Sequence, residues 1–489
     1  MDAPALFCLS LANSFALTRN FNIMSTAEIG LIGLGTMGAA LASNIADNGF
    51  DIAVWNRTTS VTHDFHAQAA ELAPKITPTD TLKDFVAAIK SPRAIILMVP
   101  AGDPVDQQIA ALRPLLDDDD LIIDAGNALF HDTNRRAREA TAPFLGVGVS
   151  GGEEGARFGP AIMGGGKREY WDRVEHILKA ISAKFDDTPC ATWMGEEGAG
   201  HFVKAVHNGI EYADMQMIAE VYGVMRDGMG MNAADIGDVF ARWNEGPLQS
   251  YLIEISGEVA KATDPKSGKA MLDIIVDAAG QKGTGRWTAI EAQHLAAPIP
   301  AIEAAVVARN LSSRMDERAA GEDLFGTAPQ KMDADAITLD QLEQALIAGK
   351  VLCYAQGFTM IEAASDSYGW ALPLPAIAQN WRAGCIIRSA MLDDMATALG
   401  ENPDRNLMFA PVFADYLKGN HAALRAVVAT GALHGIAMPA LSSNIAYFDA
   451  MRTSRGTANM IQGQRDFFGR HGFARFDMDG KDHHGPWAD

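Results

Sequence analysis

Residues 28–58, "EIGLIGLGTMGAALASNIADNGFDIAVWNRT", constrain the fold more than any other part of the chain. Two short apolar runs enclose an alanine-rich segment, and Gly33, Gly35 and Gly38 supply the pattern GxGxxG at its start. Glycines at this spacing permit a tight turn after a strand and let a pyrophosphate approach the beginning of a helix closely. A turn that serves packing alone is the alternative, and GxGxxG by itself is a weak signal. In this order of strand, turn, helix and strand it predicts a dinucleotide-binding unit.

More apolar runs follow, in alternation with helical segments, at residues 94–100, 121–127 and 144–150. They are continuous rather than alternating, as the strands of a parallel sheet are when helices cover both of its faces. We therefore expect residues 27–198 to form an α/β domain of the Rossmann type, with its site beyond the carboxyl ends of the strands.

The residues after the second predicted strand bear on the choice of cofactor. Sites that take NAD place an acidic residue here, where it binds the ribose 2′-hydroxyl. This chain has Asn56, Arg57 and Thr58 instead. No carboxylate is present to repel a 2′-phosphate, and Arg57 can form a charge-assisted hydrogen bond with one, which favours NADP. A solvent-facing arginine after a strand is the alternative.

From about residue 199 the pattern changes to the 3.6-residue period of helices, and few strand-like runs remain. The periodic stretches are 201–231, 291–317, 338–366 and 374–399. We expect residues 199–455 to form a large all-α domain. Residues 456–489 are polar and rich in glycine, arginine and aromatic residues, which is poor material for a core. We expect them to form an extended C-terminal tail that is either disordered or docked on another surface.

Charge and cysteine content exclude some classes of function. The net charge of −21 argues against nucleic acid or an anionic membrane as partner, although local lysines and arginines can still bind an anionic metabolite. The four cysteines are Cys8, Cys190, Cys353 and Cys385. They are far apart and form no CxxC pair, so neither a disulfide framework nor a zinc site is expected. Free thiols in a reducing cytoplasm are the expected state.

Residues 1–26 are treated separately. They are apolar but lack the basic region of a secretory signal, and they are too broken for a membrane span. Because Met24 directly precedes the fingerprint segment, we expect a disordered leader or a mispredicted start.

The segment "VKAVHNGIEY", residues 203–212, concentrates chemistry at helical spacing. Its polar members at positions i, i+3, i+4 and i+7 are Lys204, His207, Asn208 and Glu211. Side chains at these positions share one face of a helix. The ordinary interpretation is a solvated face, and the alternative is a row of proton-transfer and hydrogen-bonding groups that faces a substrate.

Two other segments suit anions. Ser150, Gly151 and Gly152 follow a predicted strand, where a hydroxyl and exposed N–H groups can bind a carboxylate. Lys282 lies in the glycine-rich "QKGTGRWT", and Arg309 follows in "VVARN". A lysine and an arginine with flexible backbone suggest a phosphate site, although each residue taken singly is as consistent with a structural role.

Several motifs together resemble one family. These are "GLGTMG", "NRT", "DAGN", "VSGGEEGARFGP", "KAVHNGIEY", "QKGTGRWT", "WRAGCIIRS" and "QRDFFGRH". In their order and residue identities they resemble the motifs of decarboxylating 6-phosphogluconate dehydrogenases of the long-chain form. The resemblance implies a cytoplasmic oxidoreductase of the pentose phosphate pathway (the pentose shunt) and of gluconate utilisation. It implies NADP-linked, metal-free conversion of 6-phosphogluconate to ribulose 5-phosphate and CO₂, and a homodimer in which each tail completes the partner's site.

The resemblance also assigns roles. It makes Lys204 the general base and Glu211 the general acid. The substrate-binding residues that it implies are Asn127, Ser150, Gly151, Gly152, His207, Asn208, Tyr212, Lys282, Arg309, Arg465 and His471. The cofactor-binding residues are Gly33, Leu34, Gly35, Thr36, Met37, Gly38, Asn56, Arg57, Thr58, Val99, Pro100, Ala101 and Asn127. Val61 and Pro100 stand where many relatives have lysines that face the cofactor, so NAD stays open as a weaker alternative.

Two other functions compete with this one. A β-hydroxyacid dehydrogenase that acts on a short unphosphorylated acid shares the glycine fingerprint and a catalytic lysine, but is shorter and lacks the KGTGxW loop. A catalytically silent nucleotide sensor on the same fold would be expected to lack Lys204 or Glu211. No convincing carboxylate or histidine cluster is visible in the sequence, and no metal is expected.

Overall fold

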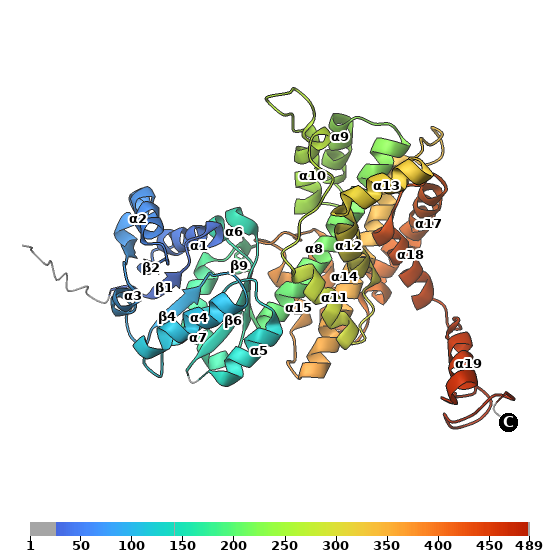
Figure 1. Ribbon diagram of the computed structural model, residues 1–489. Helices are drawn as coiled ribbons and strands as arrows, with labels where there is room; N and C mark the ends of the chain where they lie inside the picture. The colour runs from blue at the N-terminus through green and yellow to red at the C-terminus, as the bar shows by residue number, and fades with distance from the viewer. Residues whose placement is uncertain (1–25, 141, 488–489) are drawn as a thin grey trace, which may run out of the picture.

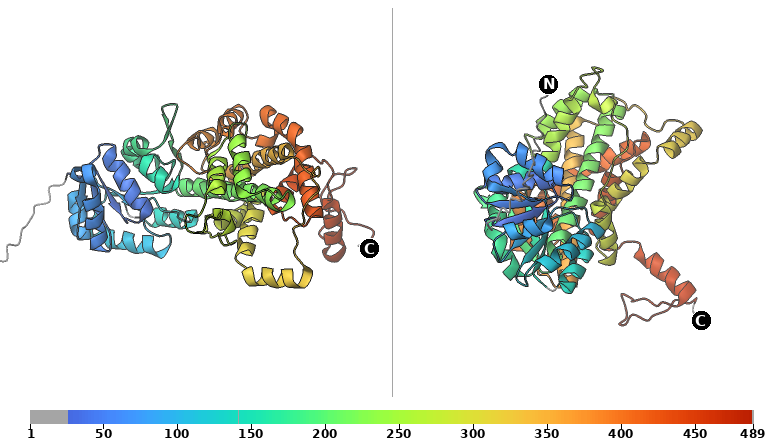
Figure 2. Two further views of the ribbon diagram at one scale, coloured as in Figure 1. Left: turned by 90° about the horizontal axis from the view of Figure 1, so that it is seen from above. Right: turned by 60° about the vertical axis from the view of Figure 1, so that its left-hand side comes forward.

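The computed structural model describes residues 26–140 and 142–487, so the expected leader lies outside the described residues except for its last position. A sheet domain, a larger helical domain and a tail follow one another along the long axis of the molecule (Figure 1). Figure 2 shows the same order from two further directions. The predicted fold class, a Rossmann-type α/β domain followed by a large helical domain, is confirmed.

The N-terminal domain is built on an eight-stranded sheet with the order β10-β7-β6-β5-β4-β1-β2-β3. Its strands are β1 (Ile29–Ile32), β2 (Ile52–Trp55), β3 (Ile76–Pro78), β4 (Ala94–Leu97), β5 (Leu121–Asp124), β6 (Phe144–Val149), β7 (Ile162–Gly165) and β10 (Ala191–Gly195). Neighbours pair in parallel except β6 and β7, which are antiparallel. The expectation of a parallel sheet is therefore wrong at this one pairing. β8 (Lys184–Phe185) and β9 (Thr188–Pro189) form a separate hairpin.

Apolar residues fill both faces of this sheet. Leu31 belongs to one core and the next residue, Ile32, to the other, because successive strand residues point to opposite faces. Because both faces of the sheet are buried, the strand segments of the sequence are continuously apolar. The helices of the domain are α1 (Thr36–Asp47), α2 (Thr59–Gln68), α3 (Leu82–Ala88), α4 (Asp103–Leu112), α5 (Phe130–Glu139), α6 (Gly152–Phe158) and α7 (Arg168–Ile181).

The helical domain begins with α8 (Ala199–Gly223), which continues into a π-helical turn (Val224–Gly228). The helices that follow are α9 (Ala233–Trp243), α10 (Tyr251–Lys261), α11 (Thr284–His294), α12 (Pro300–Ser312), α13 (Met315–Phe325), α14 (Leu339–Tyr368), α15 (Leu374–Asn380), α16 (Met391–Glu401), α17 (Pro411–Leu433) and α18 (Pro439–Met451). The periodic stretch 291–317 is broken because Pro300 begins a new helix, and 374–399 is broken by the segment that carries "WRAGCIIRS".

Specific capping residues set both ends of α14, the longest helix among the described residues. Thr338 accepts a hydrogen bond from the Gln341 N–H, and the Gln341 side chain accepts one from the Thr338 N–H, which forms a capping box at the N-terminus. At the other end Gly369 adopts a φ of 68°, the left-handed conformation that ends helices. Between its ends α14 packs against α8 and α17 in the main apolar core.

The tail contains α19 (Ala458–Gly469) and stands apart from the body of the molecule (Figures 1 and 2). The buried carboxylate of Asp466 organises it, because it accepts hydrogen bonds from the N–H groups of Gly472 and Gly485 and from the Trp487 indole. Large apolar side chains of the tail, among them Phe468, are left exposed. The tail is therefore a locally ordered structure without a core of its own.

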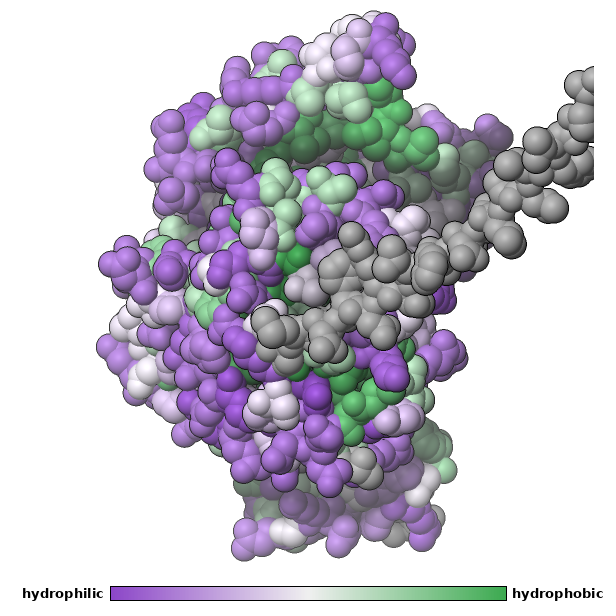
Figure 3. Space-filling view, turned by 90° about the vertical axis from the view of Figure 1, so that its left-hand side faces the viewer, coloured by the Kyte–Doolittle hydropathy of each residue, from purple (hydrophilic) through white to green (hydrophobic). Residues whose placement is uncertain are grey.

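Hydrophilic residues cover most of the face on the sheet side of the molecule, and hydrophobic residues gather in a hollow toward its upper part (Figure 3). Within residues 26–140 and 142–487, none of the helices combines the length and hydropathy that a bilayer crossing needs. Cys190, Cys353 and Cys385 are buried free thiols, and Cys8 lies outside the described residues.

Candidate active site

Two neighbouring cavities lie between the sheet and the helical domain. The first, of about 930 Å³, follows the glycine fingerprint and the ends of β2 and β4. The second, of about 630 Å³, lies over α8. Met37, Asn127 and Lys282 line both cavities, so a ligand in one lies next to a ligand in the other.

The glycine fingerprint leaves room for a ligand at one position only. A Cβ added to Gly33, whose φ is +98°, would lie 2.5 Å from the carbonyl oxygen of Met98, and one added to Gly38 would lie 1.9 Å from that of Gly33. A Cβ on Gly35 would meet no protein atom within 4 Å. Because no side chain caps the beginning of α1, its first N–H groups are open to an anion. The first cavity therefore fits the pyrophosphate of a dinucleotide.

The segment after β2 supports and borders this cavity. The Leu34 N–H donates to Asn56 Oδ1 at 3.1 Å, and the buried Leu34 does not line the cavity, so its contact with the cofactor stays a prediction. Arg57 is exposed, lines the cavity and forms no ion pair within the described ranges. Pro100 also lines it, whereas Val61 packs against the sheet core. The remaining predicted cofactor residues that line it are Gly33, Gly35, Thr36, Met37, Gly38, Asn56, Thr58, Val99, Ala101 and Asn127.

Glycines let α8 lie directly on the sheet. A Cβ on Gly148 of β6 would lie 2.5 Å from the Cβ of Lys204. This close approach buries the polar stripe of α8 between the two domains, so the solvated face considered from the sequence is wrong. Lys204, His207 and Asn208 are 7%, 0% and 9% exposed, and the Glu211 side chain is 20% exposed.

Hydrogen bonds connect the stripe to both domains. Lys204 Nζ donates to Asn208 Oδ1 at 2.6 Å and lies 3.4 Å from Ser150 Oγ. Asn208 Oδ1 also accepts from His207 Nδ1 at 2.9 Å, which leaves His207 Nε2 to accept from Ser150 Oγ at 3.2 Å. Asn208 Nδ2 donates to Thr284 Oγ1 at 2.9 Å. These bonds fix the amine of Lys204 at the wall of the second cavity.

Burial shifts the ionisation of this stripe. It lowers the pKa of Lys204, and the negative charge of Glu211 opposes this effect only partly. Burial, together with Lys204, places the pKa of His207 well below its usual value, so this imidazole is neutral at physiological pH. Burial also raises the pKa of Glu211. Burial therefore shifts Lys204 toward the neutral amine that can accept a proton and Glu211 toward the carboxylic acid that can donate one, and both groups line the same cavity.

The turn after β6 is fixed by a distant segment. Gly151 has a φ of +107°, and a Cβ there would lie 2.6 Å from the carbonyl oxygen of Gly384. That same oxygen accepts from the Ala161 N–H at 2.7 Å. The motif "WRAGCIIRS" thus holds the Ser150–Gly152 turn against the cavity, where all three turn residues line the wall.

Two cationic side chains line the second cavity. The Arg309 guanidinium lies 3.5 Å from the ring centroid of Tyr212, and its Nη1 donates to the carbonyl oxygen of Gly280 at 3.2 Å. Lys282 lines the same cavity. Neither Arg309 nor Lys282 forms an ion pair in the part of the chain that the structure describes, so both charges are available to an anion.

Three predicted substrate residues do not line the second cavity of this chain. His207 lies behind Ser150 and Asn208 and acts on the cavity only through them. Arg465 and His471 belong to the tail, away from both cavities, and Arg465 donates to Gln462 within its own helix. Their predicted contact with substrate requires a second chain and stays a prediction.

Other lining residues were not singled out from the sequence. In the second cavity they are Val149, Gly280, Gln281, Thr284 and Ile386, and in the first they include Trp55, Leu82, Met98, Gln107 and Gln108. Thr284 and Gln281 lie within the motif "QKGTGRWT", which could have indicated them. Gln107 and Gln108 belong to no motif, so the sequence carries no comparable signal for them.

Comparisons with known proteins agree on one family. The family model described as "NAD binding domain of 6-phosphogluconate dehydrogenase" matches residues 28–195, and "6-phosphogluconate dehydrogenase, C-terminal domain" matches residues 200–487. A Plasmodium falciparum 6-phosphogluconate dehydrogenase, solved in its apo form, with its cofactor NADP⁺ and with its substrate 6-phosphogluconate, matches with a TM-score of 0.89. It is 37% identical, and the match covers 94% of this chain and 100% of that one.

Two relatives from Bacillus subtilis (strain 168) differ in their cofactor. The NAD(+)-dependent, decarboxylating 6-phosphogluconate dehydrogenase is 45% identical over 462 residues, which cover 93% of this chain and 98% of the relative. The NADP(+)-dependent, decarboxylating enzyme is 42% identical over 463 residues, which cover 94% and 98%. Overall similarity therefore does not distinguish the two cofactors.

Proposed function

The chain belongs to the family of decarboxylating 6-phosphogluconate dehydrogenases, and from this we propose that it converts 6-phosphogluconate to ribulose 5-phosphate and CO₂, with Lys204 and Glu211 as its proton-transfer groups. One observation carries the assignment of residues. A buried amine and a buried carboxyl line a single cavity, and that cavity shares Met37, Asn127 and Lys282 with the dinucleotide cavity. Oxidation next to a nicotinamide and subsequent proton transfers can therefore take place on one bound molecule.

The charges of the cavity walls suggest how the substrate is oriented. Lys282 and Arg309 would bind the phosphate, since both are free of carboxylate partners within the described ranges, and Tyr212 holds the Arg309 guanidinium in place. Ser150 and the N–H groups of the following glycines would bind the carboxylate at the other end. This orientation brings the central carbons of the substrate over Lys204.

The oxidation step requires a base. NADP would be held by the glycine fingerprint and Arg57, and when bound it supplies a nicotinamide that accepts the hydride from C3. Neutral Lys204 would accept the proton of the C3 hydroxyl while that hydride leaves. Asn208 orients the amine for this step, because its oxygen accepts one of the Lys204 N–H groups at 2.6 Å.

Decarboxylation and protonation complete the reaction. The 3-keto acid loses CO₂, and protonated Lys204 would transfer its proton to the keto oxygen, which gives a neutral enediol. Glu211, whose pKa is raised by burial, would then deliver a proton to C1 while Lys204 takes back the hydroxyl proton at C2 as the ketone forms there. Transfer of that proton from Lys204 to Glu211 would regenerate the starting state of the enzyme.

Substrate selectivity tests this function. We expect NADPH to form with 6-phosphogluconate and NADP, together with CO₂, and to form far more slowly with 3-hydroxyisobutyrate. Equal or greater activity with 3-hydroxyisobutyrate would favour a β-hydroxyacid dehydrogenase. Dinucleotide binding without turnover of either compound would favour a nucleotide sensor.

For the cofactor, we propose a preference for NADP that depends on Arg57. Hydrogen bonds to charged groups contribute about 1.5–3 kcal/mol, so Arg57→Ala should raise the KM for NADP about 10- to 100-fold. The KM for NAD should change little, because NAD has no 2′-phosphate. Lys90→Ala is the matched control, since it removes an exposed positive charge of the same domain away from the cavity. An equal effect of Arg57→Ala on both cofactors would contradict this role.

For assembly, we propose a homodimer in which Arg465 and His471 of the tail enter the partner's second cavity. The support is the exposed apolar surface of a tail that has no core, which is typical of a surface that contacts another chain. Mixed dimers test this proposal. Lys204→Ala and Arg465→Ala homodimers should each be nearly inactive at low substrate concentration.

After the two variants are unfolded and refolded together, half of the dimers contain one chain of each kind. One site in each mixed dimer then has every wild-type group, so we expect recovery of roughly a quarter of the wild-type activity. If the mixture stays as inactive as its parents although subunit exchange is demonstrated, each tail serves its own chain.

A further inference from the structure

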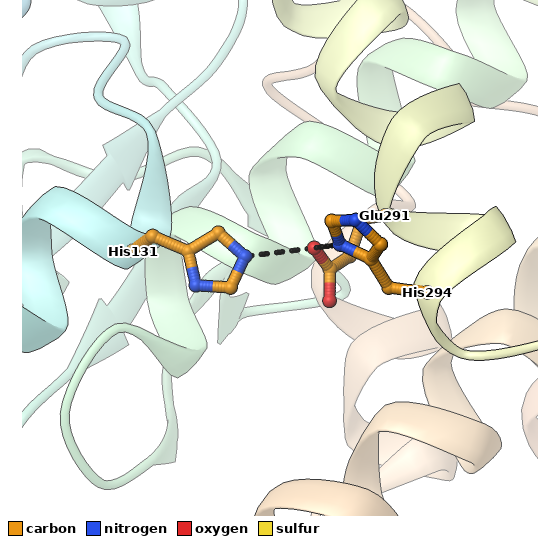
Figure 4. A group of neighbouring side chains, drawn as sticks. All are labelled: His131, Glu291 and His294. Atoms are coloured by element: carbon orange, nitrogen blue, oxygen red, sulfur yellow. Dashed lines mark hydrogen bonds and ion pairs between the residues drawn. The ribbon is translucent and has the colours of Figure 1, made fainter.

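Two histidines and a glutamate converge outside both cavities, where the sheet domain meets the helical domain. His131 comes from α5, and Glu291 and His294 come from the last turns of α11 (Figure 4). His131 Nε2 lies 2.8 Å and His294 Nδ1 lies 3.4 Å from the same oxygen, Oε2 of Glu291. One donor atom from each residue lies within 4.8 Å of the other two.

These three donors match the needs of a borderline divalent cation. Two imidazoles and one carboxylate, with a water in the fourth position, form a known donor set for zinc. Ligand atoms about 2 Å from a tetrahedral ion lie about 3–4 Å from one another, close to the spacing seen here. Imidazole donors favour zinc, copper or nickel over magnesium and calcium, which prefer oxygen ligands alone.

The surroundings hold the three groups in place. Tyr368 donates its hydroxyl hydrogen bond to Glu291 Oε1, the oxygen that faces away from the histidines, and so orients Oε2 toward them. Such outer hydrogen bonds position metal ligands. The His131 ring packs against the Phe130 ring with a centroid separation of 3.9 Å. The carboxylate is therefore oriented from the protein interior and one imidazole is oriented by an aromatic neighbour.

Burial and access are also suitable. The Glu291 side chain is 5% exposed, while those of His131 and His294 are 47% and 66% exposed. Solvent can therefore reach the histidine side of the cluster.

We propose that His131, Glu291 and His294 bind one divalent transition-metal ion of the zinc class, which links the sheet domain to the helical domain. This inference is independent of the proposed catalytic function. The ion would join α5, which follows the loop of Asn127, to α11, whose first residue Thr284 accepts the hydrogen bond from Asn208. It would therefore stabilise the relative position of the two walls of the site.

Zinc binding to the intact, chelator-treated protein tests the proposal. In competition with a chromophoric zinc indicator, we expect one tight site per chain, and His131→Gln and His294→Gln should each weaken it at least about tenfold, as even the loss of an outer hydrogen bond does in zinc sites. His63→Gln is the matched control. It removes a histidine that also lies 2.7 Å from a carboxylate, that of Asp80, but that belongs to no group of three converging donors among the described residues. Magnesium should not displace the zinc.

Thermal unfolding gives a second readout. Zinc should raise the unfolding midpoint of the wild type and of His63→Gln, because a ligand that binds the folded state stabilises it. It should not raise that of His294→Gln, an exposed position whose substitution leaves the core intact. The proposal is overturned if the wild type binds no zinc, if His63→Gln weakens binding as much as His131→Gln, or if neither cluster variant changes it. The cluster would then be an interdomain hydrogen-bonded contact only.

Discussion

Two lysines of the helical domain are buried, and they differ in one partner. Lys350 of α14 donates to both carboxylate oxygens of Asp214, at 2.7 and 3.0 Å, and to Ser250 Oγ at 3.2 Å. Lys204 of α8 donates to an amide oxygen, that of Asn208, and none of the described carboxylates lies within ion-pair distance of it. The helix that carries Lys204 also carries Asp214, so one helix places a carboxylate in an ion pair with the structural lysine and an amide against the lysine of the site.

The difference shows how burial can serve either structure or chemistry. A buried ammonium group loses its hydration, and an ion pair with further hydrogen bonds compensates for that loss. Without a carboxylate, the loss of hydration favours the neutral amine instead, which is why the pKa of Lys204 is lowered. Only a neutral amine can act as a base. On this account the Asn208 amide matters as much as Lys204 itself.

The largest expected effect follows from replacement of Lys204, the buried lysine that has no carboxylate in an ion pair with it. Lys204→Met should lower turnover of 6-phosphogluconate by about 10²- to 10⁴-fold, the contribution of a general base. Binding of NADPH, measured by its fluorescence, should stay almost unchanged, because Lys204 lines the second cavity and not the first. Retention of more than roughly a tenth of the wild-type rate would be incompatible with a general base at this position.

The same substitution at the other lysine should affect stability instead. Lys350→Met leaves the buried Asp214 carboxylate uncompensated and should lower the free energy of unfolding by about 3–5 kcal/mol in denaturant titrations. Lys204→Met is the matched control and should change that free energy little, because no buried carboxylate depends on Lys204. Lys350→Met with Asp214→Leu should recover most of the loss. If both single variants lose the same stability, the two lysines do not differ in the way described.

Replacement of Asn208 by aspartate should give Lys204 the kind of carboxylate partner that Lys350 has. Asn208→Asp places a carboxylate 2.6 Å from Lys204, much as Asp214 lies beside Lys350. An opposite charge favours the ammonium form and should raise the pKa of Lys204. Because the base must be neutral, the acid limb of kcat/KM should move to higher pH.

Asn208→Ala is the control for that shift. It removes the same hydrogen bonds without adding charge, so it should lower activity but not move the acid limb to higher pH. An acid limb that stays in place in Asn208→Asp would show that Lys204 does not titrate in the reaction.

Features of this molecule are predictable from the sequence when the residues that form them lie close together along the chain. Features formed by residues far apart along the chain are not. The first strand, glycine turn and helix are predicted because Gly33, Gly35 and Gly38 meet their structural requirements locally. β7 was missed because its sequence, "IMGG", is half glycine, and its glycines are required by contacts with Trp171 and with the beginning of α8. Such a requirement is visible only in the folded structure.

Likewise, some residues of the candidate site can be predicted from the local sequence and others cannot. Lys204 and Glu211 could be selected from one helical stripe, and the structure brings them to one cavity, although their roles stay predictions. Lys282 and Arg309 were indicated as a phosphate site by their charge and the glycine-rich loop, and the family resemblance assigned them to the 6-phosphate. The Lys350–Asp214 pair and the His131–Glu291 contact join residues 136 and 160 positions apart, and no local pattern announces them. Arg465 and His471 lie on the tail, away from both cavities, so a single chain does not bring them to the candidate substrate site.

The central claim is that Lys204 is a neutral amine because it is buried without a carboxylate, and competitive labelling measures this most directly. The native protein is treated with trace acetic anhydride over a series of pH values, and the acetylation of each lysine is quantified by mass spectrometry. The account predicts that Lys204 becomes reactive well below the ordinary lysine pKa of about 10.4. Lys204 should be acetylated at lower pH than exposed lysines such as Lys83, and Lys350 should stay unlabelled until the protein unfolds. Acetylation of Lys204 over the same pH range as Lys83 would contradict the account.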